Sequence, residues 1–254
     1  MGTREAYAPG VFCWVDLATS DVDGAKAFFK NLFGWEYEDR NAGDGQTYTM
    51  ASRDGHVVAG VMAAADPGPP RWQSYIAVAS ADDAAAKAAS AGAQVLMAPV
   101  DVGPAGRAAL LEDPSGAAVF VWEARERVGA ALVNASGALC WNDLLTHDVT
   151  KAAAFYETVF GWDLAPVEGA PGNRQSVRVG TTLNGGIAEV MTPELPSHWL
   201  ACFAVDDVPA AREAAEAAGG RPLTDVFELP SGRFAVVTDP QHAAFGIIDG
   251  DMDP

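Results

Sequence analysis

The sequence lacks the features that mark several classes of protein. Its 254 residues hold three cysteines, Cys13, Cys140 and Cys202, and these form no Cys-x-x-Cys pair. An odd number of cysteines in apolar, strand-like segments indicates buried, reduced thiols rather than a disulfide framework or a redox motif. Because reduced thiols persist in reducing compartments, we expect a cytoplasmic location.

Positive charge and long apolar runs are also scarce. The chain has 16 Lys and Arg residues against 34 Asp and Glu residues, which gives a formal net charge of −18. A surface this acidic repels phosphate backbones and anionic lipid headgroups, so neither nucleic acid nor a membrane surface is an expected partner. No apolar run reaches the roughly 18 residues that span a bilayer, and residues 1–10 do not have the pattern of a secretory signal.

Motifs of histidine-based chemistry are missing too. The four histidines, His56, His147, His198 and His242, show no HxH or HExxH spacing. No Ser-His-Asp or Cys-His arrangement and no phosphate-binding glycine loop is recognisable. The sequence therefore predicts neither a histidine metal centre nor a nucleophilic triad.

What the sequence does contain is an internal repeat. Residues 12–35 (FCWVDLATSDVDGAKAFFKNLFGW) align without a gap with residues 139–162 (LCWNDLLTHDVTKAAAFYETVFGW), and about half of the positions are identical. A Gly-Arg pair followed by Asp-Pro then occurs at residues 106–114 and again at residues 232–240. Agreement at both ends of each half predicts two related domains in tandem.

Each half has the same order of expected elements. Residues 12–19 place Val15 and Leu17 on one face and Trp14 and Asp16 on the other, and this period of two predicts a strand. A helix with a Gly stop and three short strands follow, and then the order restarts. The expected helix N-caps are Asp21, Asp82, Asp148 and either Asp206 or Asp207.

The repeated order predicts an α+β fold of four βαβββ modules, two in each domain. We place the domains at residues 8–125 and 137–251, with a polar linker rich in small residues at 126–136. Either half is apolar enough to bury a core of its own.

Four βαβββ modules with these anchor residues resemble the vicinal oxygen chelate superfamily of glyoxalases, bleomycin-resistance proteins and extradiol dioxygenases. The resemblance rests on an Asp followed by Phe-(Phe/Tyr)-x3-Phe-Gly-Trp, at residues 21–35 and 148–162, and on the two Gly-Arg and Asp-Pro segments. More narrowly, the chain is similar to tandem two-domain glyoxalase-like proteins of actinobacteria. The resemblance implies that two modules form one half-open curved sheet, with a ligand site on the concave face and helices outside.

Metal-dependent members of this superfamily bind a divalent ion in the cleft through His, Gln and Glu side chains. The resemblance places those ligand positions at Trp14 and Trp141, Gln73 and Leu200, Phe120 and Gly246, and near Gly60 and Gly186. Only Gln73 among these residues offers a donor atom, and one donor does not make a metal site. We therefore expect no metal and no other cofactor.

The concave face is instead expected to be aromatic. The alternation that buries Val15 under the helix directs Trp14 into the cleft, and Trp141 matches it in the second domain. Such a surface suits a flat apolar ligand held by stacking. The candidate ligand-binding residues are Trp14, Trp141, Gln73, Phe120, Trp122 and Leu200. Alternatively, the two tryptophans plug the former metal cavity and pack as core.

Asp16 and Asp143 are the candidate acid–base residues, since they share the tryptophans' face of the strand. A carboxylate beside an indole loses hydration, so its pKa rises toward the range useful for proton transfer. Alternatively, each carboxylate pairs with an Arg or a backbone N–H. Arg107 and Arg233 are expected as structural partners or, alternatively, as ligand anchors.

These features predict a metal-independent protein that binds or transforms a hydrophobic, aromatic or polyketide-like small molecule in secondary-metabolite biosynthesis or resistance. If the protein is an enzyme, it is a cofactor-free isomerase, cyclase or lyase that uses Asp16 or Asp143 as a base. One alternative is a protein that only sequesters its ligand, and a second is a metal-dependent lyase or dioxygenase. A monomer or a homodimer is expected, because duplicated modules can replace a dimer of single-domain relatives.

Overall fold

The computed structural model describes residues 2–43, 45–65, 68–168, 173–190, 192–229 and 232–250. The first module consists of β2 (Phe12–Thr19), α1 (Val22–Phe33), β3 (Glu36–Gly43), β4 (Gln46–Arg53) and β5 (His56–Ala63). The second consists of β6 (Arg71–Val78), α2 (Ala81–Ser90), β7 (Gln94–Val102), β8 (Gly106–Glu112) and β9 (Ala118–Ala124). These eight strands form one mixed sheet in the order β3-β4-β5-β2-β6-β9-β8-β7.

The second half repeats this arrangement. Its third module consists of β11 (Leu139–Thr146), α3 (Val149–Phe160), β12 (Asp163–Pro166), β13 (Gln175–Val179) and β14 (Thr182–Glu189). The fourth consists of β15 (His198–Ala204), α4 (Val208–Ala217), β16 (Arg221–Pro222), β17 (Phe227–Leu229), β18 (Gly232–Thr238) and β19 (Ala244–Gly250). The sheet order is β12-β13-β14-β11-β15-β19-β18-β16, and β17 pairs with β18.

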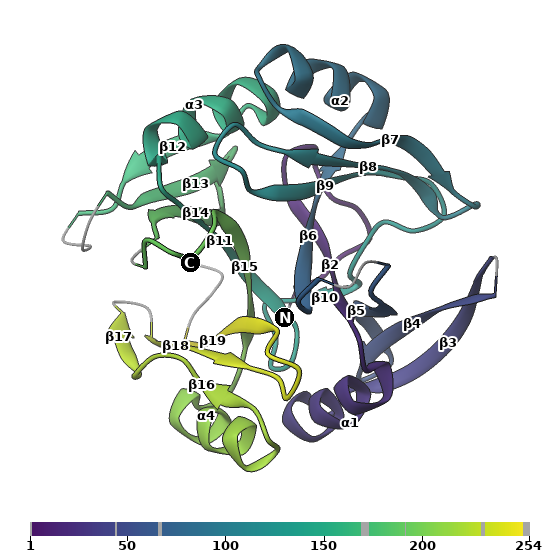
Figure 1. The fold of residues 1–254 in the computed structure, drawn as a ribbon, viewed down its shortest axis with the longest axis vertical. Coiled ribbons are helices and arrows are strands. Elements are labelled where there is room, and N and C mark those ends of the chain that lie inside the picture. Colours follow the sequence, from purple (N-terminus) through teal and green to yellow (C-terminus); the bar gives the residue numbers. More distant parts are fainter. Residues whose placement is uncertain are drawn as a thin grey trace.

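The predicted α+β class and the four βαβββ modules in two tandem domains are thus confirmed (Figure 1). A short extra pair, β1 (Gly2–Thr3) with β10 (Leu132–Val133), joins the start of the chain to the linker. The domain limits proposed above remain predictions, and their last position, residue 251, lies outside the described residues.

The helices begin and end where local chemistry directs them, with one correction. Asp21 accepts a hydrogen bond from the Gly24 N–H at the start of α1, and Gly34 ends that helix in the left-handed region at φ 69°. The second helix is capped by Ser80 and not by Asp82 as expected. Asp82 is the second residue of α2, in its first turn, where its carboxylate pairs with Arg107. A hydroxyl one residue before the helix accepts the orphan N–H groups equally well, and the sequence pattern favoured the acid.

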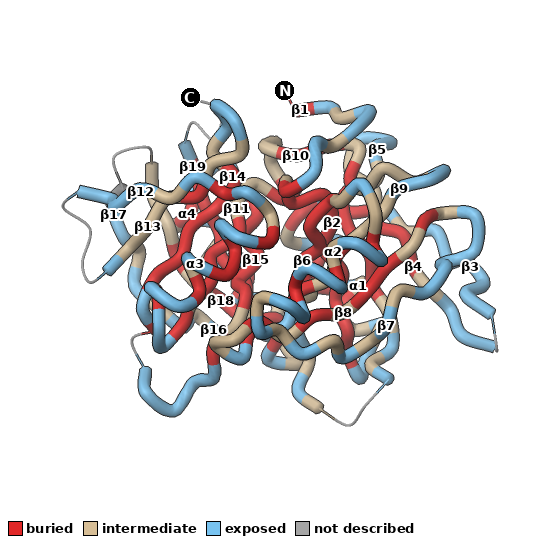
Figure 2. Tube along the Cα trace, turned by 90° about the horizontal axis from the view of Figure 1, so that it is seen from above, coloured by how far each residue is buried: buried red, intermediate tan, exposed pale blue. Residues whose placement is uncertain are grey.

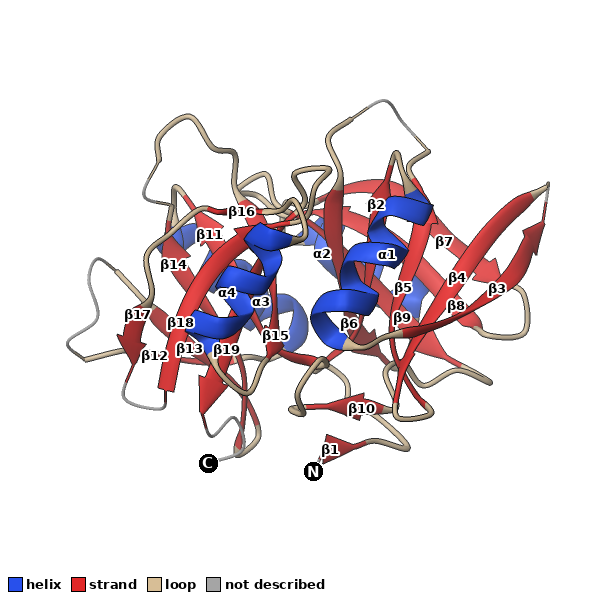
Figure 3. Cartoon of the chain, turned by 90° about the horizontal axis from the view of Figure 1, so that it is seen from below, coloured by secondary structure: helices blue, strands red, loops and turns tan. Residues whose placement is uncertain are grey.

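The two domains pack through the sides of their sheets that carry the helices. Helix α1 lies beside α4, and α2 lies beside α3, so each helix pair contains one helix from each domain (Figure 1). Seen from below, the two domains lie side by side with the helices toward the middle of the molecule (Figure 3), and the central strands β6 and β15 contact each other between the helix pairs. The concave faces of the sheets are therefore directed away from this interface.

Aromatic side chains fill the interface and make it a shared core. Phe33 of α1 lies 5.2 Å from Phe203 of the other domain between ring centroids. The indoles that end the first helix of each domain are buried and cross the boundary: Trp35 Nε1 donates to the Gly137 carbonyl at 2.7 Å, and Trp162 Nε1 donates to the Gly10 carbonyl at 2.8 Å. Burial is accordingly densest along the central strands β2, β6, β11 and β15 (Figure 2).

Candidate functional site

The concave face of the N-terminal sheet gathers a polar cluster around Asp16 in the middle of β2. Strand register places Asp16 opposite Gln73 of β6, and Trp14 opposite Tyr75 of the same strand. On the other side, Asp16 lies beside Gly60 of β5, whose missing side chain leaves room for the Tyr48 ring of β4. We call Asp16, Tyr48, Gln73 and Tyr75 the Asp16 cluster.

Three neutral donors hold the Asp16 carboxylate. Tyr75 Oη donates to Oδ2 at 2.8 Å and Tyr48 Oη donates to the same oxygen at 3.1 Å, while Gln73 Nε2 donates to Oδ1 at 3.0 Å. Tyr48 Oη in turn accepts a hydrogen bond from Trp14 Nε1 at 2.9 Å. Each polar group in the cluster thus has a partner, as burial requires.

Burial sets the acidity of this carboxyl group. Asp16 is 1 % exposed, and the loss of hydration raises its pKa to about 6, although the hydrogen bonds from Tyr75, Tyr48 and Gln73 work in the opposite direction. Burial and the neighbouring Asp16 charge also raise the pKa of both tyrosine hydroxyls, so these groups stay protonated donors at neutral pH. The Asp16 carboxyl group can therefore gain or lose a proton near neutral pH.

Aromatic and thioether side chains surround the Asp16 cluster. The Tyr75 and Phe120 rings stack with centroids 4.5 Å apart, and Trp14 packs beneath them at 8 % exposure together with Met50. Phe120, Trp122, Gln73 and Tyr48 are only half-buried. Trp14 is therefore almost withdrawn from solvent, and the half-buried side chains form the solvent-exposed rim of this face.

The linker and the start of the chain close one end of this concave face. The backbone N–H of Ala130 donates to the Cys13 carbonyl at 2.8 Å, and Tyr7 Oη donates to the Ala130 carbonyl at 2.7 Å. Trp122 Nε1 donates to the carbonyl of Arg127, whose side chain reaches Met50. The linker is thus part of the N-terminal concave face.

The C-terminal concave face carries the matching strand with different partners. Trp141 Nε1 donates to Asp143 Oδ1 at 2.8 Å, and Arg174 Nη2 lies 2.7 Å from both carboxylate oxygens. The Asp143 side chain is 6 % exposed and that of Arg174 is 31 % exposed. Here an arginine holds the carboxylate, which is the alternative that the sequence left open for Asp143. Trp141 is half-buried.

Apolar side chains cover the rest of the C-terminal face. Leu200 and Ile248 are buried with Cys202, and Phe234 packs against them. Burial raises the pKa of Cys202 and of Cys140 above the ordinary thiol range, so both remain thiols. Cys13 and Cys202 are buried as expected, whereas Cys140 is half-buried.

The residues present do not fit the metal centre of the superfamily. Trp14 and Phe120 stand at two of the ligand positions that the resemblance implies for the N-terminal domain, and the Gln73 amide is engaged with Asp16. Within the described residues no group of three or more His, Cys, Asp or Glu side chains is arranged to hold an ion. In the C-terminal domain, the side chains at the corresponding positions offer no atom that could bind a metal ion either. These residues are Trp141, Leu200, Gly186 and Gly246.

Sequence reasoning found some of these side chains and missed others. Trp14, Asp16, Gln73, Phe120 and Trp122 come together on the N-terminal face, and Trp141, Asp143 and Leu200 come together on the C-terminal face. Tyr75 was missed although it is two residues from Gln73 and so on the same face of β6. Tyr48 and Arg174 gave no comparable signal. They come from β4 and from the segment before β13, and only the folded sheets bring them to Asp16 and Asp143.

The two recurrent arginines lie outside both faces. Arg107 pairs with Asp82 at 2.8 Å and with Asp101 at 2.9 Å, while Arg233 pairs with Asp207 at 3.0 Å and with Asp249. Both arginines tie the second helix of their domain to strands of the same domain. These contacts support a structural role for both arginines and not a role as ligand anchors.

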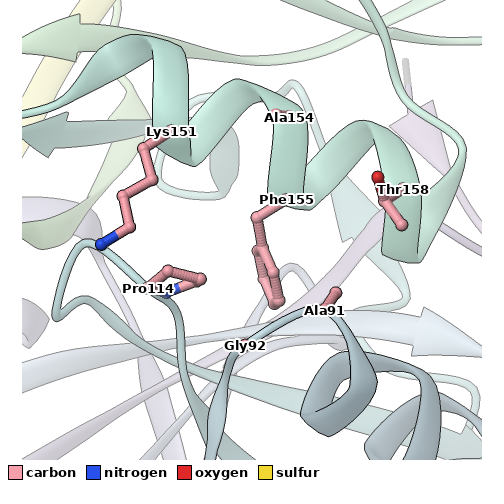
Figure 4. Close-up of a pocket in the computed structure, with 7 residues that line it drawn as sticks. All are labelled: Ala91, Gly92, Pro114, Lys151, Ala154, Phe155 and Thr158. Atoms are coloured by element: carbon pink, nitrogen blue, oxygen red, sulfur yellow. The ribbon is translucent and has the colours of Figure 1, made fainter.

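A shallow hollow at the surface lies between the end of α2 and the exposed side of α3 (Figure 4). It is lined by Ala91, Gly92, Pro114, Lys151, Ala154, Phe155 and Thr158. Lys151 is the one charged side chain of this lining, and its Nζ points along the rim toward Pro114 (Figure 4). This lining lacks the combination of acidic, hydrogen-bonding and aromatic side chains that the concave faces have. The concave faces are therefore the better candidates for a functional site.

Among the helices of the described ranges, none combines the length and apolar character needed to cross a membrane.

Comparison with protein families matches both halves of the chain. Residues 12–121 match the Glyoxalase/Bleomycin resistance protein/Dioxygenase superfamily, and residues 139–248 match a Glyoxalase-like domain.

Two relatives align over nearly the whole chain. CFP32 of Mycobacterium tuberculosis, named as a candidate glyoxylase, is 43 % identical over 256 residues that cover 98 % of each chain. The anthracycline biosynthesis protein DnrV of Streptomyces peucetius is 33 % identical over 264 residues, covering 96 % of this chain and 94 % of its own.

Solved structures of lower identity share the fold. The Mn(II)-bound glyoxalase from Novosphingobium aromaticivorans superposes with a TM-score of 0.70 at 15 % identity, covering 96 % of this chain and 83 % of its own. The 2,3-dioxygenase LapB from Pseudomonas sp. KL28 gives a TM-score of 0.68 at 15 % identity, covering 98 % and 95 %. At this identity the likeness concerns the fold and not the activity.

Proposed function

Because the chain belongs to the glyoxalase, bleomycin-resistance and dioxygenase superfamily, we propose that it binds a flat, hydrophobic aromatic small molecule on the concave face of its N-terminal sheet. The observation that carries this proposal is the half-buried aromatic rim above a buried carboxylate. Phe120 and Trp122 offer ring faces, and Tyr48 and Gln73 offer polar groups beside Asp16. Ligand sites commonly combine apolar walls with a few such polar groups.

The energetics of an aromatic rim are sufficient for useful affinity. Burial of one aromatic face contributes on the order of 1 to 3 kcal/mol, so three such contacts at the upper end of this range reach the roughly 8 kcal/mol of a micromolar dissociation constant. A polar edge on the ligand, such as a carbonyl or a phenol, can meet the Gln73 amide or the Tyr48 hydroxyl. An aromatic ketone or a hydroxylated polycycle is therefore the ligand class that this face favours.

The relatives favour a role in the chemistry of such compounds. DnrV is named for anthracycline biosynthesis, and anthracyclines are fused-ring aromatic polyketides. At 33 % identity over most of both chains, a related ligand class is a reasonable proposal for this protein. We place it in secondary-metabolite biosynthesis or resistance.

Ligand binding is proposed to be independent of a metal ion, since the superfamily's ligand positions on this face hold Trp14, Phe120 and the engaged Gln73. Elemental analysis of protein purified without added metal is expected to show no stoichiometric transition metal. Binding is expected to survive dialysis against EDTA. A tightly bound ion in each domain, or loss of binding on chelation, would favour the metal-dependent lyase or dioxygenase alternative instead.

The direct test is a titration with two probes, 2-tetralone and the hydroxylated anthraquinone alizarin, followed by tryptophan fluorescence and saturation-transfer NMR. Trp122→Ala and Phe120→Ala are expected to weaken binding by about 10-fold each, since each removes one aromatic contact. Phe227→Ala is the matched control, because Phe227 is a 49 % exposed aromatic residue of the other domain.

Binding of neither probe to the wild-type protein would overturn the proposed site. Equal loss of affinity in Trp122→Ala and Phe227→Ala would overturn it as well, because it would locate the ligand elsewhere.

A further inference from the structure

The two concave faces hold the same strand residues in opposite electrostatic states. Trp14 and Asp16 correspond to Trp141 and Asp143, and both carboxylates are almost fully buried. Asp143 faces the Arg174 guanidinium at 2.7 Å from each oxygen. The side chains that donate to Asp16, among the residues described, are Tyr48, Gln73 and Tyr75, which carry no charge.

This difference determines which carboxylate can accept a proton. A carboxylate paired with a guanidinium has its charged form stabilised and is a weak base. A buried carboxylate held by neutral donors has its charged form destabilised, so it takes up a proton more readily. Asp16 is therefore suited to act as a general base near neutral pH, whereas both oxygens of Asp143 are occupied by the Arg174 guanidinium.

The tyrosines give the cluster a second group for the same reaction. Tyr48 and Tyr75 both donate to Oδ2 of Asp16. When Asp16 is protonated, that oxygen needs one donor fewer, and the hydroxyl nearer the rim can turn to another acceptor. Both hydroxyls are buried, but Tyr48 as a residue is half-buried whereas Tyr75 is 9 % exposed, so Tyr48 is the tyrosine nearer the surface and the one we assign to a ligand oxygen.

We propose that the Asp16 cluster, and not its counterpart at Asp143, is an acid–base centre that moves a proton at the carbon next to the carbonyl of a bound aromatic ketone. Asp16 removes the proton, the C–H electron pair moves into the carbonyl, and the Tyr48 hydroxyl donates a hydrogen bond to the enolate oxygen that forms. Return of the proton to the same carbon gives exchange, and its return elsewhere in the conjugated system gives isomerisation. Neither outcome requires an oxidant, a reductant or another reactant.

Gln73 controls the approach to the second carboxylate oxygen. Its amide covers Oδ1 at 3.0 Å, and its side chain is half-buried at the rim. Rotation of this side chain toward the ligand uncovers Oδ1 without disturbing the tyrosines. The ligand's carbonyl group can then accept from the same amide, which orients the adjacent C–H toward Asp16.

The inference rests on the proposed function, and one experiment separates the two. The protein is incubated with 2-tetralone in D2O, and deuterium incorporation next to the carbonyl is followed by NMR while binding is measured by saturation transfer. The wild type is expected to accelerate exchange over buffer, with a rate that rises through about pH 6 as Asp16 loses its proton. Asp16→Asn is expected to bind the probe and to lose at least about 100-fold in exchange rate.

Asp143→Asn is the matched control, since it makes the same change on the corresponding strand of the other domain. It is expected to keep both binding and exchange. Tyr48→Phe, measured with saturating probe, is expected to lose about 10-fold in exchange rate, because the enolate loses one hydrogen-bond donor. Unfolding midpoints of all variants establish that each is folded.

The outcomes discriminate between the two proposals. Absence of probe binding to the wild type overturns the proposed function. Binding with exchange no faster than in buffer overturns the acid–base centre and leaves a protein that only sequesters its ligand. Exchange that survives Asp16→Asn, or that is lost in a folded Asp143→Asn variant, also overturns the assignment to Asp16.

Discussion

Tyr156 Oη of α3 donates a hydrogen bond to Asp113 Oδ2 of the other domain at 2.9 Å, and it accepts one from Trp199 Nε1 at 3.0 Å. All three groups are buried, so the hydroxyl satisfies a carboxylate and an indole that water does not reach. The repeat places Phe29 at the position corresponding to Tyr156, Trp72 at that of Trp199, and Asp239 at that of Asp113. Trp72 Nε1 and Asp239 Oδ2 have no hydrogen-bond partner within the described chain.

The first prediction follows from this broken symmetry. Phe29→Tyr is expected to raise the free energy of unfolding by about 1 kcal/mol, because its hydroxyl supplies the partner that Trp72 and Asp239 lack. Tyr156→Phe is expected to lower it by about 1 to 3 kcal/mol, because it leaves two buried groups unsatisfied. Urea denaturation measures both, and each variant controls for the other since each differs from the wild type by one hydroxyl at corresponding positions. A destabilised Phe29→Tyr variant would show that the Phe245 ring, 5.4 Å away, leaves no room for the oxygen.

The second prediction concerns pH. Burial raises the pKa of Asp16 to about 6, above its ordinary value in the unfolded chain. Its contribution to stability is therefore complete below about pH 4 and is lost as the pH rises through about 6. The loss amounts to at most about 3 kcal/mol.

Asp16→Asn removes this ionisation. The difference in unfolding free energy between variant and wild type, measured in urea from pH 4 to pH 7.5, is expected to shift in favour of the variant as the pH rises. A difference that stays constant over this range would contradict the raised pKa. Other carboxylates titrate in both proteins, so they cancel in the comparison.

The third prediction concerns the ion pair on the C-terminal face. Arg174→Met is expected to lower the free energy of unfolding by about 2 kcal/mol, because it leaves the buried Asp143 carboxylate without its cation. Arg178→Met is the control, since the Arg178 side chain bonds to the exposed Thr181 carbonyl nearby. The double variant Arg174→Met with Asp143→Leu is expected to recover most of the loss, because no unpaired charge remains. Equal stabilities of the two arginine variants would show that solvent screens the pair.

The fourth prediction concerns the shared core. A fragment of residues 1–136 exposes Phe29, Phe33 and Trp72, which the other domain covers in the full chain. The fragment is expected to aggregate or to lack cooperative unfolding, whereas co-expression with residues 137–254 is expected to restore a soluble complex. Size-exclusion chromatography and circular dichroism measure this. A monomeric fragment with a sharp unfolding transition would show that the N-terminal domain is self-sufficient.

Much of the fold could be predicted from the sequence because the patterns that indicate it are local or occur twice. The alternation of β2 placed Trp14 and Asp16 on the concave side, and Asp21 with Gly34 delimited α1. These features depend on backbone geometry within a few residues, which sequence patterns report directly. Because the second half repeats the first, the same assignments apply to it, including Asp148 as the N-cap of α3.

The differences between the two concave faces depended on the tertiary structure. Asp16 and Asp143 are equivalent in sequence, yet one receives tyrosine hydroxyls and the other a guanidinium. The partners Tyr48 and Arg174 lie about 30 residues along the chain from their carboxylates, and only the folded sheets bring them close.

The sequence by itself thus determined the modules, the duplication and the side of the strand on which each acid lies, because these follow from local periodicity. The partners of each acid, and the raised pKa of Asp16, were decided only when the sheets curled and packed. Burial and hydrogen bonding are properties of the assembled neighbourhood, and no local pattern specifies them.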